Sequence, residues 1–382
     1  MSKTSRLIFL TTSLITLIFS QISYVAATPT KQSIVVLGDS VAAGEGINYG
    51  YSYDVNSVFG ARWVGGVDNP AWQGQYQLCH DSKQAYGDII AGELNADLAK
   101  FACTGATYDN GLIGKREYNG TLFRPAEFGN WSTQKQLNPD YDKAMPDTVI
   151  LTLGADDVRF VDIMTFCATG FTSADTETVN SLTESERTTT AIREHFLNQY
   201  PDPESFAKAQ ASMKKTKQEE AGFFNYCTAA NPGKPIEEYF WKPINNGTLA
   251  QHYVDMVNAI KARGKKAGKV PNIIFTTYHH PLPKAGESID CHDVLDLDRD
   301  EINYINSLET TLNNTIKNAL QGLPGVAVAD LSTVMDGHRW CSDDPWTYGL
   351  SILWLNRLSQ APFHPTPAGQ KAIADIVKGL IK

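Results

Sequence analysis

A serine after an apolar run is the first residue of this chain whose setting could support chemistry. Residues 35–46 read VVLGDSVAAGEG, so Ser40 follows a β-branched run and is flanked by Gly38, Gly44 and Gly46. Glycines let a backbone bend and approach a ligand closely. The stretch predicts a turn that presents Ser40 as a nucleophile, as a helix cap or as a residue that holds a phosphate.

Known phosphate-binding loops do not match this stretch. A phosphate loop requires G-x-x-x-x-G-K-[ST] and a dinucleotide loop requires G-x-G-x-x-G, but Glu45 follows Gly44 and no lysine comes next. The G-x-S-x-G elbow of α/β-hydrolases is absent as well, because Val41 and Ala42 follow the serine. Catalysis by Ser40 would require a base and a group that orients the base.

Eight histidines could supply that base. Three are close in sequence to cysteines, where loops around disulfides are expected: His80, His292 and His338. His279 and His280 follow an apolar run, near the rim where open parallel sheets bind ligands. His364 lies in APFHPTPAGQ, where two prolines stiffen the turn and Thr366 can cap the helix that follows.

The elements that must position these residues alternate along the chain. β-branched runs predict five strands: SIVVL (33–37), DLAKFAC (97–103), DTVILTLG (147–154), NIIFTTY (272–278) and VAVADL (326–331). Apolar residues at helical spacing predict helices at 84–94, 248–266, 301–322 and 366–382. This alternation indicates an α/β fold with a parallel sheet covered on both faces.

One long segment interrupts the alternation. From about residue 167 to residue 247 the chain is polar, with TETVNSLTESERTTT and KKTKQEE. We expect helices and loops inserted after the third strand, as either a surface decoration or a cap that shapes a substrate entrance. Residues 28–382 are expected to form one domain that carries this insertion.

The start of the chain resembles a secretory signal peptide. Lys3 and Arg6 precede the apolar stretch 7–20, and small residues offer a cleavage site after about Ala27. The alternative is a membrane anchor, but the stretch is shorter than the roughly 20 residues that a spanning helix needs. We therefore expect residues 1–27 to be removed and the mature protein to be secreted without a stable membrane anchor.

The net charge bears on the possible binding partners, and the number of cysteines bears on the expected disulfides. The formal net charge is −9, which argues against nucleic acid as a partner. Six cysteines behind a signal peptide predict three disulfides, and six cysteines allow 15 pairings. No metal cluster or cofactor motif appears. N-x-S/T sequons predict glycosylation at Asn119, Asn130, Asn246 and Asn313.

Four stretches in order resemble one known family. GDSVAAGEG, FACTGAT, LTLGADDVRF and FHPTPAGQ follow the order and spacing of the four blocks of SGNH hydrolases, the GDSL-type esterases and lipases. The match runs from about residue 33 to the end. It is most similar to the secreted branch that resembles streptomycete esterases and lipases, which also have a stretch like HRWC (338–341) followed by a Trp such as Trp346. The resemblance implies a three-layer, flavodoxin-like sandwich with a five-stranded parallel sheet between helices.

The resemblance also implies a role for individual residues. Ser40 is the expected nucleophile, His364 the expected base, and the backbone N–H groups of Ser40 and Gly105 the expected oxyanion donors. Many members carry an acid three residues before the histidine; here Ala361 occupies that position, and its main-chain carbonyl could orient the base. The resemblance implies no metal and no cofactor. It further implies the disulfides Cys79–Cys103, Cys167–Cys227 and Cys291–Cys341.

The third block departs from the family pattern. Members carry G-x-N-D, whose Asn donates to the oxyanion, but this chain reads Gly154-Ala155-Asp156-Asp157. An ionised Asp156 has no donor, and loss of one oxyanion donor costs roughly 2.7–4 kcal/mol. Three interpretations stay open: a protonated Asp156 that donates, a site that works through backbone donors and another side chain, or a chain that has lost hydrolysis and kept a pocket.

The function that the sequence favours is a secreted serine esterase or lipase that hydrolyses carboxylic esters through an acyl-enzyme. One alternative is a carbohydrate acetyl esterase, in which aromatic residues stack on sugar rings: Tyr49, Tyr51, Trp63 and Trp72. Another is a non-catalytic binding protein on the same scaffold. The expected partner is an ester substrate, which could be a lipid, a small ester or an acylated carbohydrate, and the expected oligomeric state is a monomer.

Overall fold

The computed structural model divides the chain into two compact units, Met1–Lys31 and Gln32–Lys382. It describes residues 31–47, 52–54, 62–64, 79, 81–118, 131–132, 135–160, 163–164, 167, 227–229, 236–289, 297, 299–348 and 363–381. The account below concerns the second unit, and the predicted signal peptide lies outside the described residues. Among the described helices, none is both long and apolar enough to cross a bilayer.

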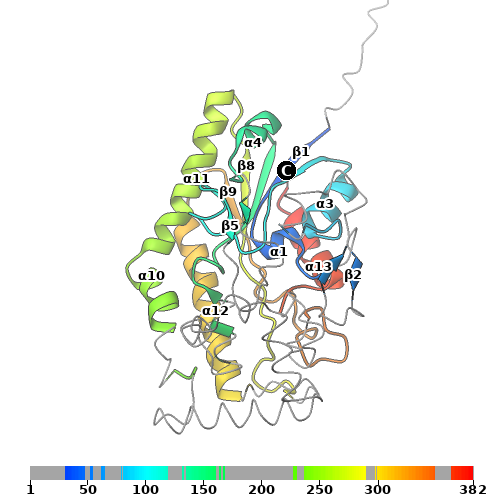
Figure 1. The fold of residues 1–382 in the computed structure, drawn as a ribbon, viewed down its shortest axis with the longest axis vertical. Coiled ribbons are helices and arrows are strands. Elements are labelled where there is room, and N and C mark those ends of the chain that lie inside the picture. Colours follow the sequence, from blue (N-terminus) through cyan, green and yellow to red (C-terminus); the bar gives the residue numbers. More distant parts are fainter. Residues whose placement is uncertain are drawn as a thin grey trace, which may run out of the picture. The chain divides into compact units, whose positions relative to one another are not determined.

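A five-stranded sheet forms the centre of the second unit (Figure 1). Its strands are β1 (Ser33–Gly38), β4 (Asp97–Lys100), β7 (Thr148–Thr152), β8 (Asn272–Thr276) and β9 (Val326–Ala329). The strand order is β4-β1-β7-β8-β9, and every neighbouring pair is parallel. Each of the five predicted strands is present, so the predicted α/β fold with a parallel sheet is confirmed.

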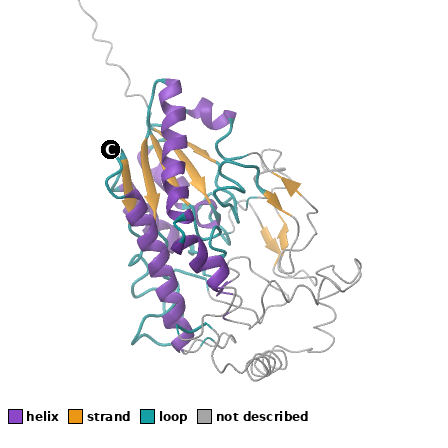
Figure 2. Cartoon of the chain, turned by 90° about the vertical axis from the view of Figure 1, so that its left-hand side faces the viewer, coloured by secondary structure: helices purple, strands orange, loops and turns teal. Residues whose placement is uncertain are grey.

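Helices cover both faces of this sheet (Figures 1 and 2). They include α3 (Tyr86–Leu94), α11 (Thr248–Ala267), α12 (Arg299–Leu320) and α13 (Pro367–Lys378). From β1 the chain steps to β4 in one direction, and from β7 it steps through β8 to β9 in the other. Because such crossovers are right-handed, α3 lies on one face and α11 and α12 lie on the other. Helix α13 packs against α3, and α11 packs against α12.

Burial explains why the apolar runs become central strands. All five residues of β7 are buried, and so are the last five of β1, including Val36, Leu37, Ile150 and Leu151, which are fully buried. Strands enclosed on both faces are apolar throughout rather than alternating. Strands β4, β7, β8 and β9 end two or three residues before their predicted ends. The residues that follow form the loops at the carboxyl edge of the sheet.

Several short elements were not predicted from the sequence. They are the helices α1 (Ser40–Ala43), α4 (Pro139–Ala144) and α10 (Lys242–Asn245), the π-helical turn η4 (Glu237–Trp241), and the hairpins β2 (Ser52–Asp54) with β3 (Arg62–Val64) and β5 (Glu117–Tyr118) with β6 (Trp131–Ser132). Turn η4 and helix α10 end the predicted insertion and lead directly into α11. Most of the remaining insertion lies outside the described residues.

Two of the three predicted disulfides are confirmed, and several of the other predicted positions lie outside the described residues. The bonds Cys79–Cys103 and Cys167–Cys227 are present. Cys341 is also disulfide-bonded, while its predicted partner Cys291 lies outside the described residues, as do the sequons at Asn119 and Asn130.

Glycosylation of Asn313 is a wrong prediction for the folded chain. Asn313 is only 2% exposed. Its side-chain oxygen accepts from Tyr278 N and its amide nitrogen donates to Tyr278 O, both at 2.8 Å. A glycan would have to break both bonds and enter the core. Asn246, by contrast, is exposed in the turn that follows α10, so its sequon stays a prediction.

Candidate active site

Ser40 stands at the junction between β1 and the short helix α1. Asp39 caps that helix, because its carboxylate accepts a hydrogen bond from Val41 N at 3.0 Å. Gly38 has a φ of 137°, and a Cβ at this position would lie 2.1 Å from Thr152 O. Only glycine fits so close to the neighbouring strand. The turn holds Ser40 at 8% exposure, at the carboxyl edge of the sheet.

His364 contacts this serine from the far end of the chain. Ser40 Oγ and His364 Nε2 are 2.7 Å apart, although 324 residues separate them in sequence. This is the hydrogen-bond distance that lets an imidazole take the proton of a hydroxyl as it attacks. The structure therefore brings together the two residues that the sequence analysis named as nucleophile and base.

The segment that carries His364 is paired with residues 346–348. Tyr348 N donates to His364 O at 2.9 Å, Phe363 N donates to Tyr348 O at 3.0 Å, and Thr366 N donates to Trp346 O at 2.8 Å. Thr366 caps α13 as predicted, with Pro367 at the first helical position. These bonds fix the backbone on both sides of the histidine. Ala361, the predicted orienting residue, lies outside the described residues.

His279 supports the same segment, a role that the sequence analysis missed. Its Nε2 lies 2.9 Å from Phe363 O. Burial is the main cause that lowers the pKa of His279 to about 3, so the ring is neutral and its Nε2–H donates to that carbonyl. Phe363 has a φ of 64°, which is unusual for a residue with a side chain. We infer that His279 holds this strained residue directly before His364.

The other two oxyanion candidates, Gly105 and Asp156, lie in the loops that follow the strands on either side of β1. Strand β1 lies between β4 and β7, so the loops after these strands flank the serine. Gly105 belongs to the loop after β4, where Cys103 N donates to Gly38 O at 3.0 Å and Thr104 N donates to Cys79 O at 3.2 Å. The Cys79–Cys103 disulfide closes this loop.

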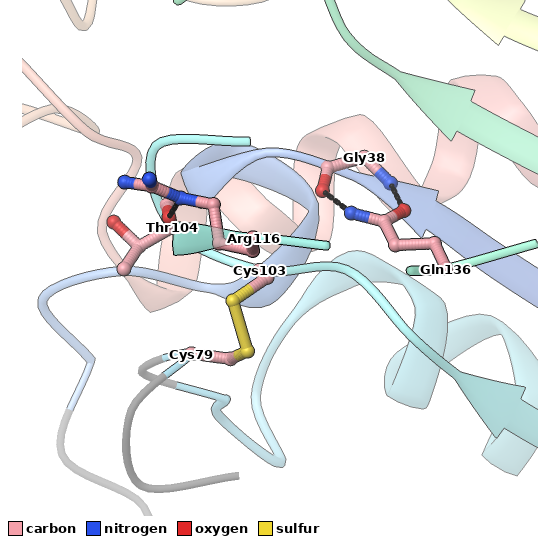
Figure 3. The surroundings of a disulfide bond; sticks show 6 residues. All are labelled: Gly38, Cys79, Cys103, Thr104, Arg116 and Gln136. Atoms are coloured by element: carbon pink, nitrogen blue, oxygen red, sulfur yellow. Dashed lines mark hydrogen bonds between the residues drawn. A yellow bond between two sulfur atoms is a disulfide. The ribbon is translucent and has the colours of Figure 1, made fainter. Parts of the chain in front are cut away.

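Figure 3 shows three further hydrogen bonds that fix this part of the molecule. Gln136 accepts from Gly38 N and donates to Gly38 O, both at 2.7 Å. Arg116 Nε donates to Thr104 O at 3.1 Å, next to Gly105. Gln136 thus holds the residue two positions before Ser40. Its isolated position in the sequence, outside every motif, gave no signal of this role.

Asp156 lies in the turn that follows β7. The turn is closed by bonds from Val158 N to Gly154 O at 3.3 Å and from Arg159 N to Asp156 O at 3.1 Å. Gly154 has a φ of 132°, and a Cβ there would lie 1.9 Å from the Tyr253 hydroxyl. Asp156 itself is half-buried.

Tyr278 connects this turn to the residue before the nucleophile. Its hydroxyl donates to the Asp39 carboxylate and accepts a hydrogen bond from Ala155 N at 2.9 Å. Asn313 holds the Tyr278 backbone through the two bonds described above. Sequence reasoning placed Tyr278 only at the end of a strand, because no local pattern marks a long-range bridge.

Three carboxyl groups share this region. The pKa of Asp39 is well above its usual range, first because the group is buried and second because of the negative charge of Asp156. Asp157 raises it further, whereas the hydrogen bonds from Tyr278 and Val41 lower it. Two such groups in a shared environment oppose each other's ionisation.

Asp157 joins the turn after β7 to the loop after β4. It accepts from Tyr108 N at 3.0 Å, three residues beyond Gly105. It also lies 3.5 Å from His252 Nδ1, and its interaction with that ring is the main cause that raises the pKa of His252. The His252 ring stacks on the Tyr108 ring, with centroids 4.2 Å apart. The second aspartate of the block thereby sets the spacing between the Gly105 loop and the Asp156 turn.

Comparison with known proteins points to one family. Residues 36–372 match the model of the GDSL-like Lipase/Acylhydrolase family. No curated protein matches the chain. Among solved structures, an extracellular lipase from Streptomyces rimosus has 17% identity, with a TM-score of 0.49 over 91% of this chain and 99% of that one.

Two further solved structures show weaker similarity. Phospholipase A1 from Streptomyces albidoflavus has 18% identity and a TM-score of 0.46 over 91% of this chain and 99% of that one. A carbohydrate esterase family 2 enzyme from Myceliophthora fergusii has 14% identity and a TM-score of 0.39 over 92% of this chain and 65% of that one.

Proposed function

Because this chain belongs to the GDSL-like lipase/acylhydrolase family, we propose that it hydrolyses carboxylic esters through an acyl-enzyme on Ser40. The observation that carries the proposal is the 2.7 Å hydrogen bond between Ser40 Oγ and His364 Nε2. A nucleophile and a base at this distance can carry out acyl transfer without further side-chain movement.

The proposed reaction has two halves. His364 takes the Ser40 proton as Oγ attacks the ester carbonyl carbon, and the carbonyl oxygen becomes an oxyanion. The backbone N–H groups of Ser40 and Gly105 stabilise that oxyanion. The carbon–oxygen bond to the alcohol then breaks, and His364 returns its proton to the leaving oxygen. In the second half, His364 takes a proton from water as the water oxygen attacks the acyl carbon. The bond between that carbon and Ser40 Oγ then breaks to release the acid, and His364 returns the proton to Ser40 Oγ.

The third oxyanion group in this proposal is a protonated Asp156. Burial and the negative charge of Asp156 raise the pKa of Asp39, so this pair of carboxyl groups favours retention of one proton, and we assign that proton to Asp156 when the oxyanion forms. A carboxylic acid that stays neutral keeps an O–H that can donate to the developing negative charge. We propose that the Ala361 carbonyl orients the His364 ring, as the family resemblance implies.

We also propose that the mature protein acts outside the cell. The apolar start of the chain and its disulfides support this, because disulfides persist in oxidising compartments.

Hydrogen-bonding side chains beside the third-block turn give a reason to keep a second substrate class. A cavity of about 260 Å³ opens there, and its lining includes Asp157, Arg159, Tyr239 and Lys242, although neither Ser40 nor His364 lines it. These side chains could bond to hydroxyl groups of an alcohol that extends beyond the proposed catalytic pair. Acylated carbohydrate is therefore the second candidate substrate. The aromatic side chains proposed for sugar stacking lie outside the described residues.

Nitrophenyl esters of increasing acyl length test both proposals. We expect turnover that Ser40→Ala abolishes and that Ser307→Ala, an exposed serine on α12, leaves unchanged. An optimum at acetyl would favour the carbohydrate esterase, and an optimum at long chains would favour the lipase. A serine-directed phosphonate should label wild type and not Ser40→Ala. Absence of both turnover and labelling in folded protein would contradict the enzyme proposal and support the binding-only alternative.

A further inference from the structure

The HRWC segment (338–341) is a motif that the proposed reaction leaves without a role. It reads His338-Arg339-Trp340-Cys341 and lies in the loop after β9. Its first three side chains each contact a different part of the structure around His364. These contacts connect the loops after β8 and β9 to the turn that carries the proposed base.

The first of these side chains, His338, stacks on Trp346. The two rings are parallel within 7°, with centroids 3.7 Å apart. Asp344 supports the stack from both sides, because its carbonyl accepts from His338 Nδ1 at 2.9 Å and its carboxylate accepts from Trp346 Nε1 at 3.2 Å. The Trp346 main-chain N–H donates to His338 O at 2.8 Å. The stack and these hydrogen bonds together fix Trp346 relative to the HRWC segment.

The main chain of Trp346 lies against α13. A Cβ at Gly369 would lie 2.3 Å from Trp346 O, so only a glycine lets the helix approach this closely. The same carbonyl accepts from Thr366 N at 2.8 Å, two residues after His364. The position of Trp346 therefore sets the position of the turn that carries the histidine.

Trp340 reaches the residue on the other side of the histidine. It packs edge to face on Phe363, with ring centroids 5.7 Å apart and planes at 81°, which is a favourable aromatic geometry. Trp340 is 5% exposed, and its N–H donates to Pro281 O at 2.9 Å. Phe363 is the residue with a φ of 64° directly before His364. Trp340 thus holds the Phe363 ring, while His279 bonds to the Phe363 carbonyl.

Arg339 ties the HRWC segment to the loop that carries His279. Its side chain is 2% exposed, and its guanidinium donates to His280 O at 2.9 Å and to Leu282 O at 3.3 Å. It also donates to the Asp336 carboxylate at 2.6 Å. A planar guanidinium with several bonds fixes the direction of the groups around it. The backbone directly after His279 is therefore held by the same segment.

Building on the proposed function, we propose that the HRWC segment positions His364 for proton transfer and that the His338–Trp346 stack sets this position. His338 acts through Trp346 and Thr366, so it is a positioning residue. Proton transfer depends on the 2.7 Å contact between His364 and Ser40, and a displacement of about 1 Å can cost roughly 100-fold in rate. The His338 side chain is 31% exposed, so its ring can be removed without opening the core.

His338→Ala and His338→Phe separate the ring stack from the rest of the side chain. The first variant removes the ring, and the second keeps a ring that can stack on Trp346 but loses the bond to Asp344 O. For the nitrophenyl ester that wild type hydrolyses best, we expect His338→Ala to lower kcat roughly tenfold at little-changed KM. Labelling of Ser40 by the serine-directed phosphonate should slow by a similar factor, and His338→Phe should recover most of both rates.

Hydrogen–deuterium exchange measures the positioning itself. The amides of Tyr348 and Thr366 donate to His364 O and Trp346 O. Both should exchange faster in His338→Ala than in wild type, because local opening becomes easier when the stack is lost. In His338→Phe their exchange should return to near the wild-type rate.

Ile260→Val is the control for a general loss of stability. It shortens a fully buried side chain of α11, so it should lower Tm while kcat and the labelling rate stay unchanged. Unchanged kcat and labelling in His338→Ala, in a protein whose wild type is active, would overturn the positioning role and leave the proposed function standing. A loss of rate that His338→Phe does not recover would overturn the role of the stack. A wild type without turnover or labelling would contradict the proposed function, and the positioning role would fall with it.

Discussion

Three carboxyl groups interact beside Ser40, the proposed nucleophile. Asp39 precedes it, and the Asp156 and Asp157 charges both raise the pKa of Asp39. A fully ionised cluster would repel the oxyanion that the reaction creates. The region therefore favours retention of a proton, and activity should depend on the pH range over which that proton is held.

Asp156→Asn is the direct test of this dependence. The substitution removes one negative charge and supplies an amide donor that needs no proton. We expect the variant to stay active and to extend its activity to higher pH, as measured by kcat/KM across about pH 4 to 9. Asp109→Asn, at an exposed position, is the matched control. An unchanged pH profile in Asp156→Asn would contradict the proposal of a protonated acid.

Tyr278 is a positioning residue whose hydroxyl can be removed alone. Tyr278→Phe leaves Ala155 N–H without its partner and takes one donor from Asp39. An unsatisfied buried group costs about 1–3 kcal/mol. We expect a lower free energy of unfolding in urea, together with a fall in kcat at little-changed KM.

Tyr304→Phe is the control for this prediction. It removes a hydroxyl that accepts from Trp241 on the α11–α12 side of the sheet, where no proposed catalytic residue lies. If Tyr278→Phe lowered stability but left kcat at the Tyr304→Phe value, Tyr278 would be a structural residue only.

At the scale of elements, the site is the meeting point of three loops after adjacent parallel strands. Strand order places β1 between β4 and β7, and side-chain bridges then set the loop spacing. Asp157 accepts from Tyr108 N, and Gln136 bonds both polar groups of Gly38. Ligand sites form at the carboxyl edge of such sheets because the loops there are free to vary while the strands stay fixed.

Gln136→Leu tests the contribution of one such bridge. Gly38 O keeps its bond from Cys103 N, but the buried Gly38 N–H loses its acceptor. We expect unfolding to become easier by about 1–3 kcal/mol and kcat to fall, because the turn before Ser40 is less fixed. Denaturant titration and steady-state kinetics measure both effects, with exposed Gln251→Leu as the control. Wild-type kcat in a destabilised Gln136→Leu would show that the bridge only supports the fold.

At the scale of the whole molecule, acid stability depends on ties between elements. Asp147 accepts from Ser33 N at 2.8 Å and pairs with Lys269 at 2.8 Å, so it joins the starts of β1 and β7 to the chain after α11. The Lys269 bond is the main cause that lowers the pKa of Asp147 from 3.8 to about 2. A carboxyl with a lowered pKa stabilises the fold above its unfolded pKa, and this contribution is lost as pH falls through 2.

Asp147→Asn should therefore lower stability in a pH-dependent way. We expect a lower Tm than wild type near neutral pH and a smaller difference as the pH approaches about 2, where the wild-type carboxyl is protonated as well. Exposed Asp109→Asn should show no such trend. A Tm difference that stayed constant between neutral and strongly acid pH would show that the Asp147 charge does not stabilise the fold.

The main elements of the fold could be predicted because their signals are local. Apolar runs and helical spacing identified all five sheet strands and four of the helices. Short helices such as α1 and α4 were not predicted, because four to six residues are too few to show a helical period. The predicted ends of β4, β7, β8 and β9 were two or three residues too late, because residues such as Leu153 and Tyr278 continue the apolar run beyond the last paired residue of the strand.

The amino-acid sequence by itself determined the chemistry available to this protein: a serine in a glycine-rich turn, a histidine between prolines and an aspartate where the family has asparagine. Only the tertiary structure decided which groups meet. It placed His364 against Ser40, linked Tyr278 to Asp39, and buried Asn313 where a sequon had predicted a glycan. Motifs and periodicity depend on neighbours in the chain, whereas these contacts depend on packing between residues up to 324 positions apart.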